Sequence, residues 1–516
     1  MMTTNLTAGT EVLHAVNPTT RKQLPGEFAV ATQEEIGQAA TAAHAAWLTY
    51  QQTSGVEKAA FLRAIATEIE ALGDALIDRA VAESGLPPGR ITGERGRTCG
   101  QLRKFADFVE EGRWVGAIID EAQPERQPMP RADLRKMLVP IGPVVVFTAS
   151  NFPLAFSTAG GDTAAALAAG CPVIVKAHPS HLGTNALVAG AIQKAAEECG
   201  LPEGVFSSVQ GGNETGKALV LHPQIKAVGF TGSHRGGMAL TELANSRPEP
   251  IPVYAEMGSN NPVFLLPEKV AESAENLATM IAGSVNMGAG QFCTNPGILV
   301  VQKSAETDRF MAAFGTAMSG LSAATMLNEG IFQAYGNGVA AVADVQGVDL
   351  SFQANIASQN WDAAPAFAQT SAQKFLKESA LQQEVFGPFT LIVLCEDAQE
   401  MLAVAEGLTG QLSATIMGTT DELTNAGDLL NVLSQKAGRV ICNGMPTGVE
   451  VCAAMHHGGP YPATTNALFT SVGTDAIKRF ARPVTFQDLP DVLLPPALQA
   501  KNPLGISRTV NGQIVG

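Results

Sequence analysis

Residues 144–176 read VVVFTASNFPLAFSTAGGDTAAALAAGCPVIVK, and this stretch decides the fold. The apolar run Val144–Phe147 predicts a buried strand, and the alanine-rich segment Thr158–Ala169 predicts a helix. Residues Pro172–Lys176 predict a second buried strand. Because helices that join parallel strands cover both faces of the sheet, the stretch predicts an α/β fold of a nucleotide-binding type.

The alternation of helices and strands continues on both sides of this stretch. Residues 32–115 carry apolar side chains at helical spacing, and strand-helix pairs run on to Pro252–Ala255. A second α/β unit starts near Gly258. Its expected strands are Pro262–Leu266, Ile298–Val301, Thr390–Leu394, Ser413–Met417 and Arg439–Cys442. Residues 446–462, rich in Gly, Pro and His, predict a loop over a site, whereas 351–365 give only a weak pattern.

Composition excludes several classes of protein. At 516 residues the chain is too long for one core, so we expect two or three domains. The formal charge of −15, without a basic patch, argues against nucleic acid and membranes as partners. Seven cysteines without a CxxC pair predict free thiols and therefore the cytoplasm. Met1–His14 lacks the apolar core of a signal peptide, and no apolar run is long enough to span a bilayer.

The candidate nucleophile is Cys293, which lies in the segment GQFCTNPG at residues 290–297. This polar turn separates an expected helix, Glu268–Met287, from the strand Ile298–Val301. Glycines on both sides allow the backbone to come close to a ligand. The alternative is an inert thiol, because free cysteines are mostly core residues. That alternative is preferred for three cysteines in apolar strands, Cys171, Cys395 and Cys442.

Four more chemically useful side chains lie where expected strands meet loops. They are Asn151, Lys176, Glu256 and Glu384, and strand ends are where α/β sheets bind ligands. The G-x-G-x-x-G fingerprint of ordinary dinucleotide folds is absent. Phosphate contacts are instead expected near Gly211-Gly212 with Gly216, and at Phe230-Thr231-Gly232-Ser233, where a strand ends and a helix begins.

Together these segments resemble the aldehyde dehydrogenase superfamily over almost the whole chain. Six motifs occur in the family order: Asn-Phe-Pro from 151, Lys176, Phe-Thr-Gly-Ser from 230, the Glu256 motif, Gly-Gln-Phe-Cys from 290, and Glu-Val-Phe-Gly-Pro from 384. The resemblance implies a Rossmann-like cofactor domain, an α/β catalytic domain and a β-hairpin oligomerisation element. It places the cofactor domain at 1–115 and 140–257, rejoined by about 463–490. The catalytic domain is then 258–462, and 116–139 and 491–516 are oligomerisation strands.

The resemblance also implies a role for each site residue. Cys293 attacks the aldehyde, its backbone N–H and the Asn151 amide stabilise the oxyanion, and Glu256 activates the water that hydrolyses the thioester. By the same resemblance, Lys176 belongs to the catalytic set and also contacts the adenosine ribose. Glu384, beside Phe386, holds the nicotinamide ribose. The full set of expected cofactor contacts is Thr148, Ser150, Lys176, His178, Ser180, Gly212, Gly216, Phe230, Thr231, Gly232, Ser233, Met257, Glu384 and Phe386. No metal is expected, and a loop is preferred over a metal pair for His456-His457.

Departures from the common family pattern refine the expected cofactor and substrate. Many members have a ribose-binding glutamate after the strand-end lysine, but here the run is Lys176-Ala177-His178-Pro179-Ser180. Without a carboxylate to repel the 2′-phosphate, NADP should work at least comparably with NAD. Ser259, the segment 293–297 and residues 457–462 resemble the branch of α-ketoglutaric semialdehyde (2,5-dioxopentanoate) dehydrogenases of sugar-acid, pentose or hydroxyproline breakdown. An NADP-dependent long-chain fatty aldehyde dehydrogenase is the alternative, favoured by an apolar tunnel with Phe156, Phe292 and Met455 near its mouth.

Three further points stay open at this stage. An oxo-acid substrate needs a cation, and Arg103, Arg113 and Arg439 are available without one being singled out.

Acyl transfer to coenzyme A and a catalytically inactive relative are the competing functions; Glu256 argues against the first, and the presence of Cys293 and Asn151 against the second. The exposed strand 131–139 and the terminal hairpin around Asn511-Gly512, expected to lack a partner in its own sheet, predict a homodimer or homotetramer.

Overall fold

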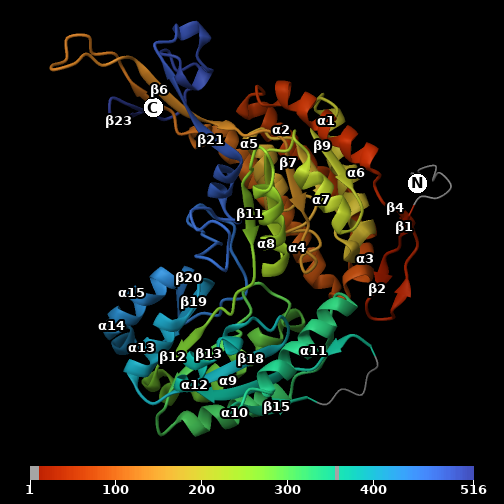
Figure 1. Cartoon of the computed structure of the whole chain (residues 1–516), viewed down its shortest axis with the longest axis vertical. Helices are drawn as coiled ribbons and strands as arrows, with labels where there is room; N and C mark the ends of the chain where they lie inside the picture. The colour runs from red at the N-terminus through yellow and green to blue at the C-terminus, as the bar shows by residue number, and fades with distance from the viewer. Residues whose placement is uncertain (1–10, 355–359) are drawn as a thin grey trace.

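The computed structural model describes residues 11–354 and 360–516. Figure 1 shows two lobes stacked along the long axis and a narrow extension at the upper end. Each lobe is built on its own sheet, and the extension is built on a third. The sequence expectations for residues 1–10 and 355–359 lie outside the described residues.

The upper lobe contains a five-stranded sheet in which all neighbouring strands are parallel. Its order is β11-β10-β7-β8-β9, with β7 (Val144–Phe147), β8 (Val173–Lys176), β9 (Phe206–Val209), β10 (Ala227–Thr231) and β11 (Val253–Glu256). Its helices are α1 (Gln33–Tyr50), α2 (Gly55–Ala71), α3 (Gly73–Ser84), α4 (Pro88–Glu111), α5 (Gly161–Ala169), α6 (Leu182–Glu198), α7 (Asn213–Leu221) and α8 (His234–Asn245). The predicted parallel sheet is thus confirmed.

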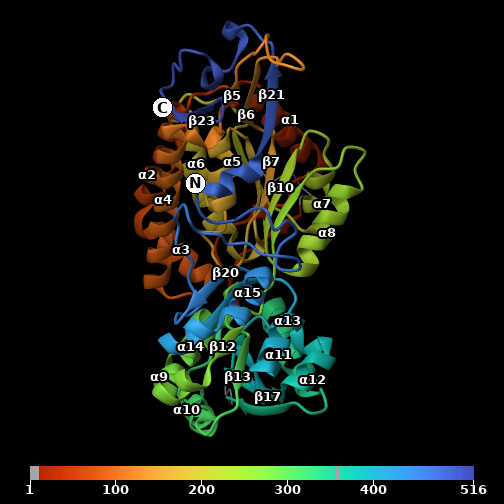
Figure 2. The ribbon, with the colours of Figure 1, turned by 90° about the vertical axis from the view of Figure 1, so that its left-hand side faces the viewer.

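Helices lie on both sides of this sheet, with α2 and α4 on one side and α7 and α8 on the other in Figure 2. The side chains of β7 explain this arrangement, because Val144 and Val146 pack in one hydrophobic cluster and Val145 in another. Alternate residues of a strand point to opposite faces, so an all-apolar strand needs cover on both. The packing also explains why the sequence 144–147 carries no polar residue.

The lower lobe contains a seven-stranded sheet in the order β15-β17-β18-β13-β12-β19-β20. The strands are β12 (Val263–Leu265), β13 (Ile298–Gln302), β15 (Asp349–Gln353), β17 (Ala366–Ser371), β18 (Phe389–Cys395), β19 (Gln411–Met417) and β20 (Ala437–Cys442). All pairs are parallel except β15 with β17. The helices are α9 (Pro267–Asn286), α10 (Thr307–Ser319), α11 (Glu329–Ala343), α12 (Ala372–Lys377), α13 (Ala398–Gly407), α14 (Thr420–Asn425) and α15 (Gly427–Lys436).

The extension is a five-stranded sheet in the order β21-β6-β5-β22-β23. Its strands are β5 (Ile118–Asp120), β6 (Leu134–Pro140), β21 (Ala481–Gln487), β22 (Arg508–Val510) and β23 (Gln513–Val515). The hairpin of β22 and β23 forms as predicted, but the expectation that it lacks a partner in its own sheet is wrong, because β22 pairs with β5. The edge strands are β21 and β23, and in β23 Ile514 is 83% exposed.

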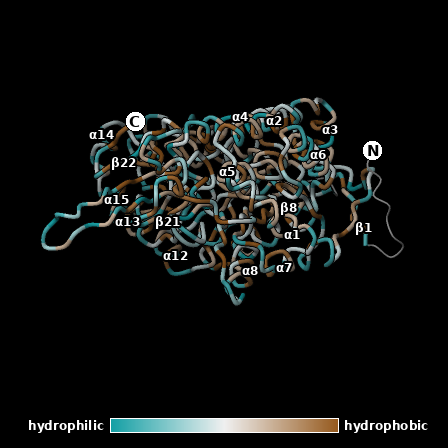
Figure 3. The backbone as a smooth tube through the Cα atoms, turned by 90° about the horizontal axis from the view of Figure 1, so that it is seen from above, coloured by the Kyte–Doolittle hydropathy of each residue, from teal (hydrophilic) through white to brown (hydrophobic). Residues whose placement is uncertain are grey.

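The domain boundaries stay a prediction, with one difference at β21. We placed residues 463–490 with the cofactor domain, whereas 481–487 pair with β6 in the extension. Short strands complete the described residues: β1 (Val12–Leu13), β2 (Val16–Asn17), β3 (Lys22–Gln23), β4 (Phe28–Ala29), β14 (Ala324–Thr325) and β16 (Asp362–Ala363). In the described part of the chain, no helix combines the length and apolar character needed to cross a membrane. Figure 3 shows hydrophilic residues along the loop that projects from the main body.

Candidate active site

Two of the predicted site residues are the last residues of strands in the upper sheet. Glu256 ends β11 and Lys176 ends β8, while Asn151 lies in the loop that follows β7. Parallel strands present their carboxyl ends at one edge of the sheet. These side chains therefore share the edge of the upper sheet, as the sequence predicted.

The Cys293 loop reaches this edge from the lower lobe. It precedes β13 and is held by Asn261, whose Nδ2 donates to the carbonyls of Cys293 and Asn295 at 2.9 Å each. Gly290 allows a close approach, but the close neighbour is the protein itself: a Cβ on Gly290 would lie 2.1 Å from the carbonyl carbon of Gly387. The loop is therefore fixed by the body of the lower lobe.

The Glu256-Met257-Gly258-Ser259 turn links the two lobes and accounts for one departure in the sequence. The Ser259 hydroxyl lies 2.9 Å from Gln411 Oε1 and 3.1 Å from Asn261 Oδ1. It also accepts the Leu412 backbone N–H at 3.0 Å. A glycine at 259 would lose these bonds, so Ser259 helps to orient the asparagine that clamps the Cys293 loop.

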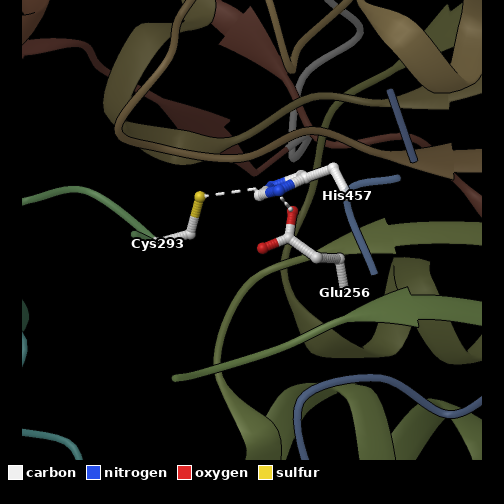
Figure 4. A group of neighbouring side chains, drawn as sticks. All are labelled: Glu256, Cys293 and His457. Carbon is white, nitrogen blue, oxygen red and sulfur yellow. Dashed lines mark hydrogen bonds and ion pairs between the residues drawn. The ribbon is translucent and has the colours of Figure 1, made fainter. Parts of the chain in front are cut away.

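Cys293, His457 and Glu256 meet at the centre of the site (Figure 4). The Nε2 atom of His457 lies 3.5 Å from Cys293 Sγ and 3.4 Å from Glu256 Oε2. The side chains of His457 and Glu256 are only 2% and 3% exposed, and Cys293 is half-buried. Neither carboxylate oxygen of Glu256 has a hydrogen-bond partner in the part of the chain that the structure describes. One imidazole nitrogen therefore stands between a thiol and a buried carboxylate.

The site residue that sequence reasoning missed is His457. We preferred a polar loop over a metal pair for His456-His457, and His457 does lie in a loop, but we assigned it no role in the site. The segment after it runs beside β11, where Thr465 N donates to the Ala255 carbonyl at 3.1 Å and Met257 N to Ala463 at 2.7 Å. The backbone N–H of His457 donates to Thr470 Oγ1 at 2.8 Å. The neighbouring pair Gly458-Gly459 could have indicated that this loop is tightly packed. A Cβ at either position would collide with backbone atoms.

The electrostatics of the centre disfavour a thiolate in the free protein. Burial, followed by the charges of Glu256 and Glu384, raises the pKa of the Cys293 thiol well above its ordinary value. Burial also raises the pKa of Glu384 to about 8, with the charge of Glu256 acting in the same direction. Cys293 therefore needs a nearby proton acceptor before it can act as a nucleophile.

Asn151 is brought beside the Cys293 loop, where it donates from Nδ2 to the Gln291 carbonyl at 3.0 Å. Arg90 of α4 lies between two aromatic rings of this region, 4.6 Å from the Phe152 centroid and 4.7 Å from that of Phe292. Its Nη2 also donates to the Asn151 carbonyl at 3.5 Å. The amide of Asn151 therefore lies against the loop that carries Cys293, and its role at the oxyanion stays a prediction.

Glu384 and Phe386 lie in the segment that leads into β18, and both are half-buried. The Glu384 carboxylate lies over Gly258, where an added Cβ would be 2.2 Å from its Oε2. A hydrogen bond from the Ser259 backbone N–H lowers the pKa of this carboxyl group, which partly opposes the increase caused by burial. In this position Glu384 is close to Glu256 and Cys293.

The β8 end carries two polar groups that could bind an anion, Lys176 and His178. Lys176 is half-buried, burial lowers its pKa to about 8, and no carboxylate partner acts on its ammonium within the described ranges. His178 accepts the Ser180 N–H at Nδ1, so the ring proton of the neutral imidazole is at Nε2. Burial, then His181 and Lys176, lowers the pKa of His178. An ammonium and an imidazole N–H suit a phosphate.

Of the other predicted cofactor contacts, some lie at helix starts and some serve packing. Gly212 and Ser233 are the N-cap residues of α7 and α8, where free N–H groups can bind phosphate. Thr148 and Ser150 lie in the loop after β7, and Phe230 and Thr231 end β10. A Cβ at Gly216 would lie 2.9 Å from the Phe147 ring, and one at Gly232 would lie 2.7 Å from Phe230.

Met257, another of the predicted cofactor contacts, packs its side chain in the core. Its side chain belongs to the hydrophobic core, is 1% exposed and packs against Gly237 of α8. The side chain therefore serves helix packing, and a cofactor contact of Met257 would have to go through its backbone. That contact stays a prediction.

Two further observations concern metals and the remaining cysteines. The ligand-capable atoms of Glu256, Cys293 and His457 lie within 4.8 Å of one another, so the centre could geometrically hold an ion. Cys171 and Cys395 are buried, as expected, although Cys171 precedes β8 and is not part of it. Cys442 is exposed at the end of β20, so its assignment to an apolar interior is wrong.

Comparison of the sequence with known proteins identifies its family. The model of the "Aldehyde dehydrogenase family" matches residues 6–335 of the chain. The chain belongs to this family. It is 53% identical over 487 residues to alpha-ketoglutaric semialdehyde dehydrogenase 2 of Azospirillum brasilense, covering 94% of this chain and 93% of the relative. It is 47% identical to alpha-ketoglutaric semialdehyde dehydrogenase of Acinetobacter baylyi, covering 98% of this chain and 96% of the relative.

A solved structure supports the fold. Betaine aldehyde dehydrogenase from Staphylococcus aureus in complex with NAD+ superposes with a TM-score of 0.79 at 19% identity, covering 93% of this chain and 92% of that chain. The aldehyde dehydrogenase fold expected from the motifs is thereby confirmed. As a member of this family, the chain is an oxidoreductase that acts on an aldehyde with NAD or NADP.

Proposed function

We propose that this chain oxidises α-ketoglutaric semialdehyde (2,5-dioxopentanoate) to 2-oxoglutarate with NAD or NADP. The substrate is supported by the two relatives that bear this name and match nearly the full chain. The type of reaction is supported above all by one observation, the contact of Cys293, His457 and Glu256 at the edge of the upper sheet. Neither relative is a long-chain fatty aldehyde dehydrogenase, so that alternative is not favoured.

In the proposed reaction, Cys293 loses its proton to His457 Nε2 and adds to the aldehyde carbon, giving a thiohemiacetal. The distance of 3.5 Å between Sγ and Nε2 allows this transfer. The negative oxygen that forms would be stabilised by the Asn151 amide and the Cys293 backbone N–H. When bound, the nicotinamide of NAD or NADP supplies the two-electron oxidant that converts the thiohemiacetal to a thioester.

Hydrolysis of the thioester is assigned to Glu256. Neither of its oxygens accepts a hydrogen bond within the described ranges, which leaves the carboxylate available as a base for the attacking water. A cavity of about 20 Å³ adjoins Glu256 and His457, and Thr464, Thr470 and Ser471 are among its lining residues. A cavity of this size beside a carboxylate has room for one water molecule. These features argue against acyl transfer to coenzyme A, and the presence of Cys293, Glu256 and Asn151 argues against an inactive relative.

For the cofactor we propose that NADP is used at least comparably with NAD. The support is Lys176, whose ammonium has no carboxylate neighbour among the described residues, next to the Nε2–H of His178. A 2′-phosphate would pair with both groups. A kcat/KM at least about ten times higher with NAD would overturn this preference.

We further propose that the chain assembles as a homodimer or homotetramer through the extension. Strand β23 is a free edge with an 83% exposed Ile514, and such an edge pairs readily with another chain. The proposed compartment is the cytoplasm, because all seven cysteines are free. Nucleic acid and membranes remain unexpected partners on the net charge of −15.

The test is an absorbance assay of reduced cofactor with 2,5-dioxopentanoate, pentanal and dodecanal, for wild type and Cys293→Ala. We expect the highest kcat/KM with 2,5-dioxopentanoate and no activity in the variant. A preference for dodecanal would overturn the proposed substrate. Activity that survives in Cys293→Ala would overturn the mechanism.

A further inference from the structure

An arginine of α4 has a buried nitrogen that makes no hydrogen bond to any described residue. Arg97 is half-buried, and its Nη2 donates to the Val449 carbonyl at 3.3 Å. Its Nη1 is buried and has no hydrogen-bond partner anywhere in the described ranges. An unpaired buried donor on a charged group is costly, so such an atom indicates a place for an anion.

This arginine is connected to the reaction centre by direct contacts. The Arg97 guanidinium lies 5.3 Å from the centroid of the Phe156 ring, and that ring lies 6.2 Å from the ring of His457. His457 in turn contacts Cys293 at 3.5 Å. Burial lowers the pKa of Arg97, while the charges of Glu94, Cys293 and Glu450 raise it. The guanidinium is therefore one aromatic ring away from the nucleophile and within its electrostatic reach.

The arginines considered from the sequence are occupied by other partners. Arg103 forms two bonds to Glu70, at 2.7 and 2.6 Å, and Arg113 pairs with Glu111 at 3.0 Å. Both pairs lie at the surface, with the arginine side chains 44% and 62% exposed. Arg439 does interact with the charge of Cys293, but its Nη1 and Nη2 donate to the carbonyls of Gly448 and Pro446.

The bonds of Arg439 and Arg97 end on neighbouring residues, Gly448 and Val449. Two guanidinium groups thus contact the same short loop, and both feel the charge of Cys293. Of the acidic neighbours, Glu94 already accepts the backbone N–H groups of Leu154 and Ala155 at 2.8 and 2.9 Å. Neither Glu94 nor Glu450 forms an ion pair with Arg97 in the part of the chain that the structure describes.

We propose that Arg97 binds the carboxylate at the far end of the substrate through Nη1, and that Arg439 adds positive charge to the same subsite. Arg97 would then select carboxylated aldehydes over uncharged ones. The inference rests on the proposed function, since it deepens the choice of an oxo-acid semialdehyde. Three carbon atoms separate the aldehyde carbon from the carboxylate carbon of 2,5-dioxopentanoate, so an anchor beyond the first aromatic ring suits this chain length.

The test compares 2,5-dioxopentanoate with pentanal, an uncharged aldehyde of the same carbon number, in wild type, Arg97→Met and Arg97→Lys. We expect Arg97→Met to lower kcat/KM for 2,5-dioxopentanoate by roughly 10- to 100-fold, mainly through KM, because a charge-assisted bond is lost. The values for pentanal should stay within about threefold of wild type. Arg97→Lys should recover part of the loss for the oxo acid only. Arg103→Met, on the same helix, is the matched control and should change neither substrate.

Equal losses for both substrates would show that Arg97 only supports Phe156 and His457, and would overturn the proposal. Unchanged kinetics with the oxo acid would overturn it as well. The proposed function fails in a different way, through a wild-type enzyme that prefers pentanal to 2,5-dioxopentanoate. Even then, the ratio of the two substrates in Arg97→Met still measures whether Arg97 acts on the carboxylate.

Discussion

The strands β11 and β8 belong to one sheet, but the side chains at their ends differ in charge and in the contacts that they make. At the end of β11, Glu256 is buried against His457 and Cys293, which come from two other parts of the chain. At the end of β8, Lys176 keeps its ammonium without a carboxylate partner among the described residues. Proton transfer requires that the two groups are in contact. Binding of a charged ligand requires a charged group that is not already paired within the protein.

The difference arises from what covers each strand. Residues 463–465 run beside β11, with an isolated bridge between Glu256 and Thr464, and they bring His457 into place. The sequence after β8 is instead a turn in which His178 accepts the Ser180 N–H at 3.1 Å. The two strand ends can therefore be tested separately, because changes at one should leave the task of the other intact.

The largest effect that separates the two ends is expected for His457→Ala. Removing the proton acceptor beside Cys293 should lower kcat/KM by about 100- to 10,000-fold, without changing the affinity for NAD or NADP. Steady-state kinetics and a fluorescence titration of the cofactor measure the two quantities. His456→Ala is the matched control, since the neighbouring residue makes no contact with Cys293 that we observe. Activity of His457→Ala within about threefold of wild type would show that the β11 end works without the imidazole.

A smaller effect is expected when the charge of Glu384 is removed. The pKa of Glu384 is raised to about 8, so its charge disfavours the Cys293 thiolate only above about that pH. In Glu384→Gln the rate of alkylation by iodoacetamide should therefore match wild type near pH 6 and exceed it above pH 8, with the titration of Cys293 moved to lower pH. Glu214→Gln, at a surface glutamate, serves as the control. A titration moved to higher pH would contradict this electrostatic account.

The smallest effect is expected for Lys176→Met at the β8 end. The affinity for NADP should fall roughly tenfold more than the affinity for NAD, because one charge-assisted contact with the 2′-phosphate is lost. Cofactor fluorescence provides the dissociation constants, and Lys194→Met, on the surface of α6, is the control. Alkylation of Cys293 should be unaffected. An equal loss for both cofactors would show that Lys176 does not contact the 2′-phosphate.

Much of the fold follows from local sequence patterns. The parallel sheets were predictable because strands buried on both faces contain almost only apolar residues, as in 144–147 and 298–301. The prediction was poorest where the pattern is weak. We did not predict β15 or β17 in the lower lobe.

The candidate site was predictable where a residue belongs to a recognisable motif at a strand end. Asn151, Lys176, Glu256 and Cys293 lie at the shared edge for that reason. His457 was not, because it lies in the loop 443–473, where no periodicity indicates burial and only three-dimensional packing brings it to Glu256. Arg97 escaped for a related reason, since a helical arginine is normally exposed and its unpaired Nη1 becomes visible only in the structure.

The central claim is that Cys293 carries the acyl group and Glu256 releases it by activating water. The most direct test is mass spectrometry of Glu256→Gln after mixing with 2,5-dioxopentanoate and NADP. We expect the protein to gain the mass of one 2-oxoglutaryl group on Cys293, together with the formation of one reduced cofactor per active site and very slow turnover. Full turnover without an acylated Cys293 would contradict the account.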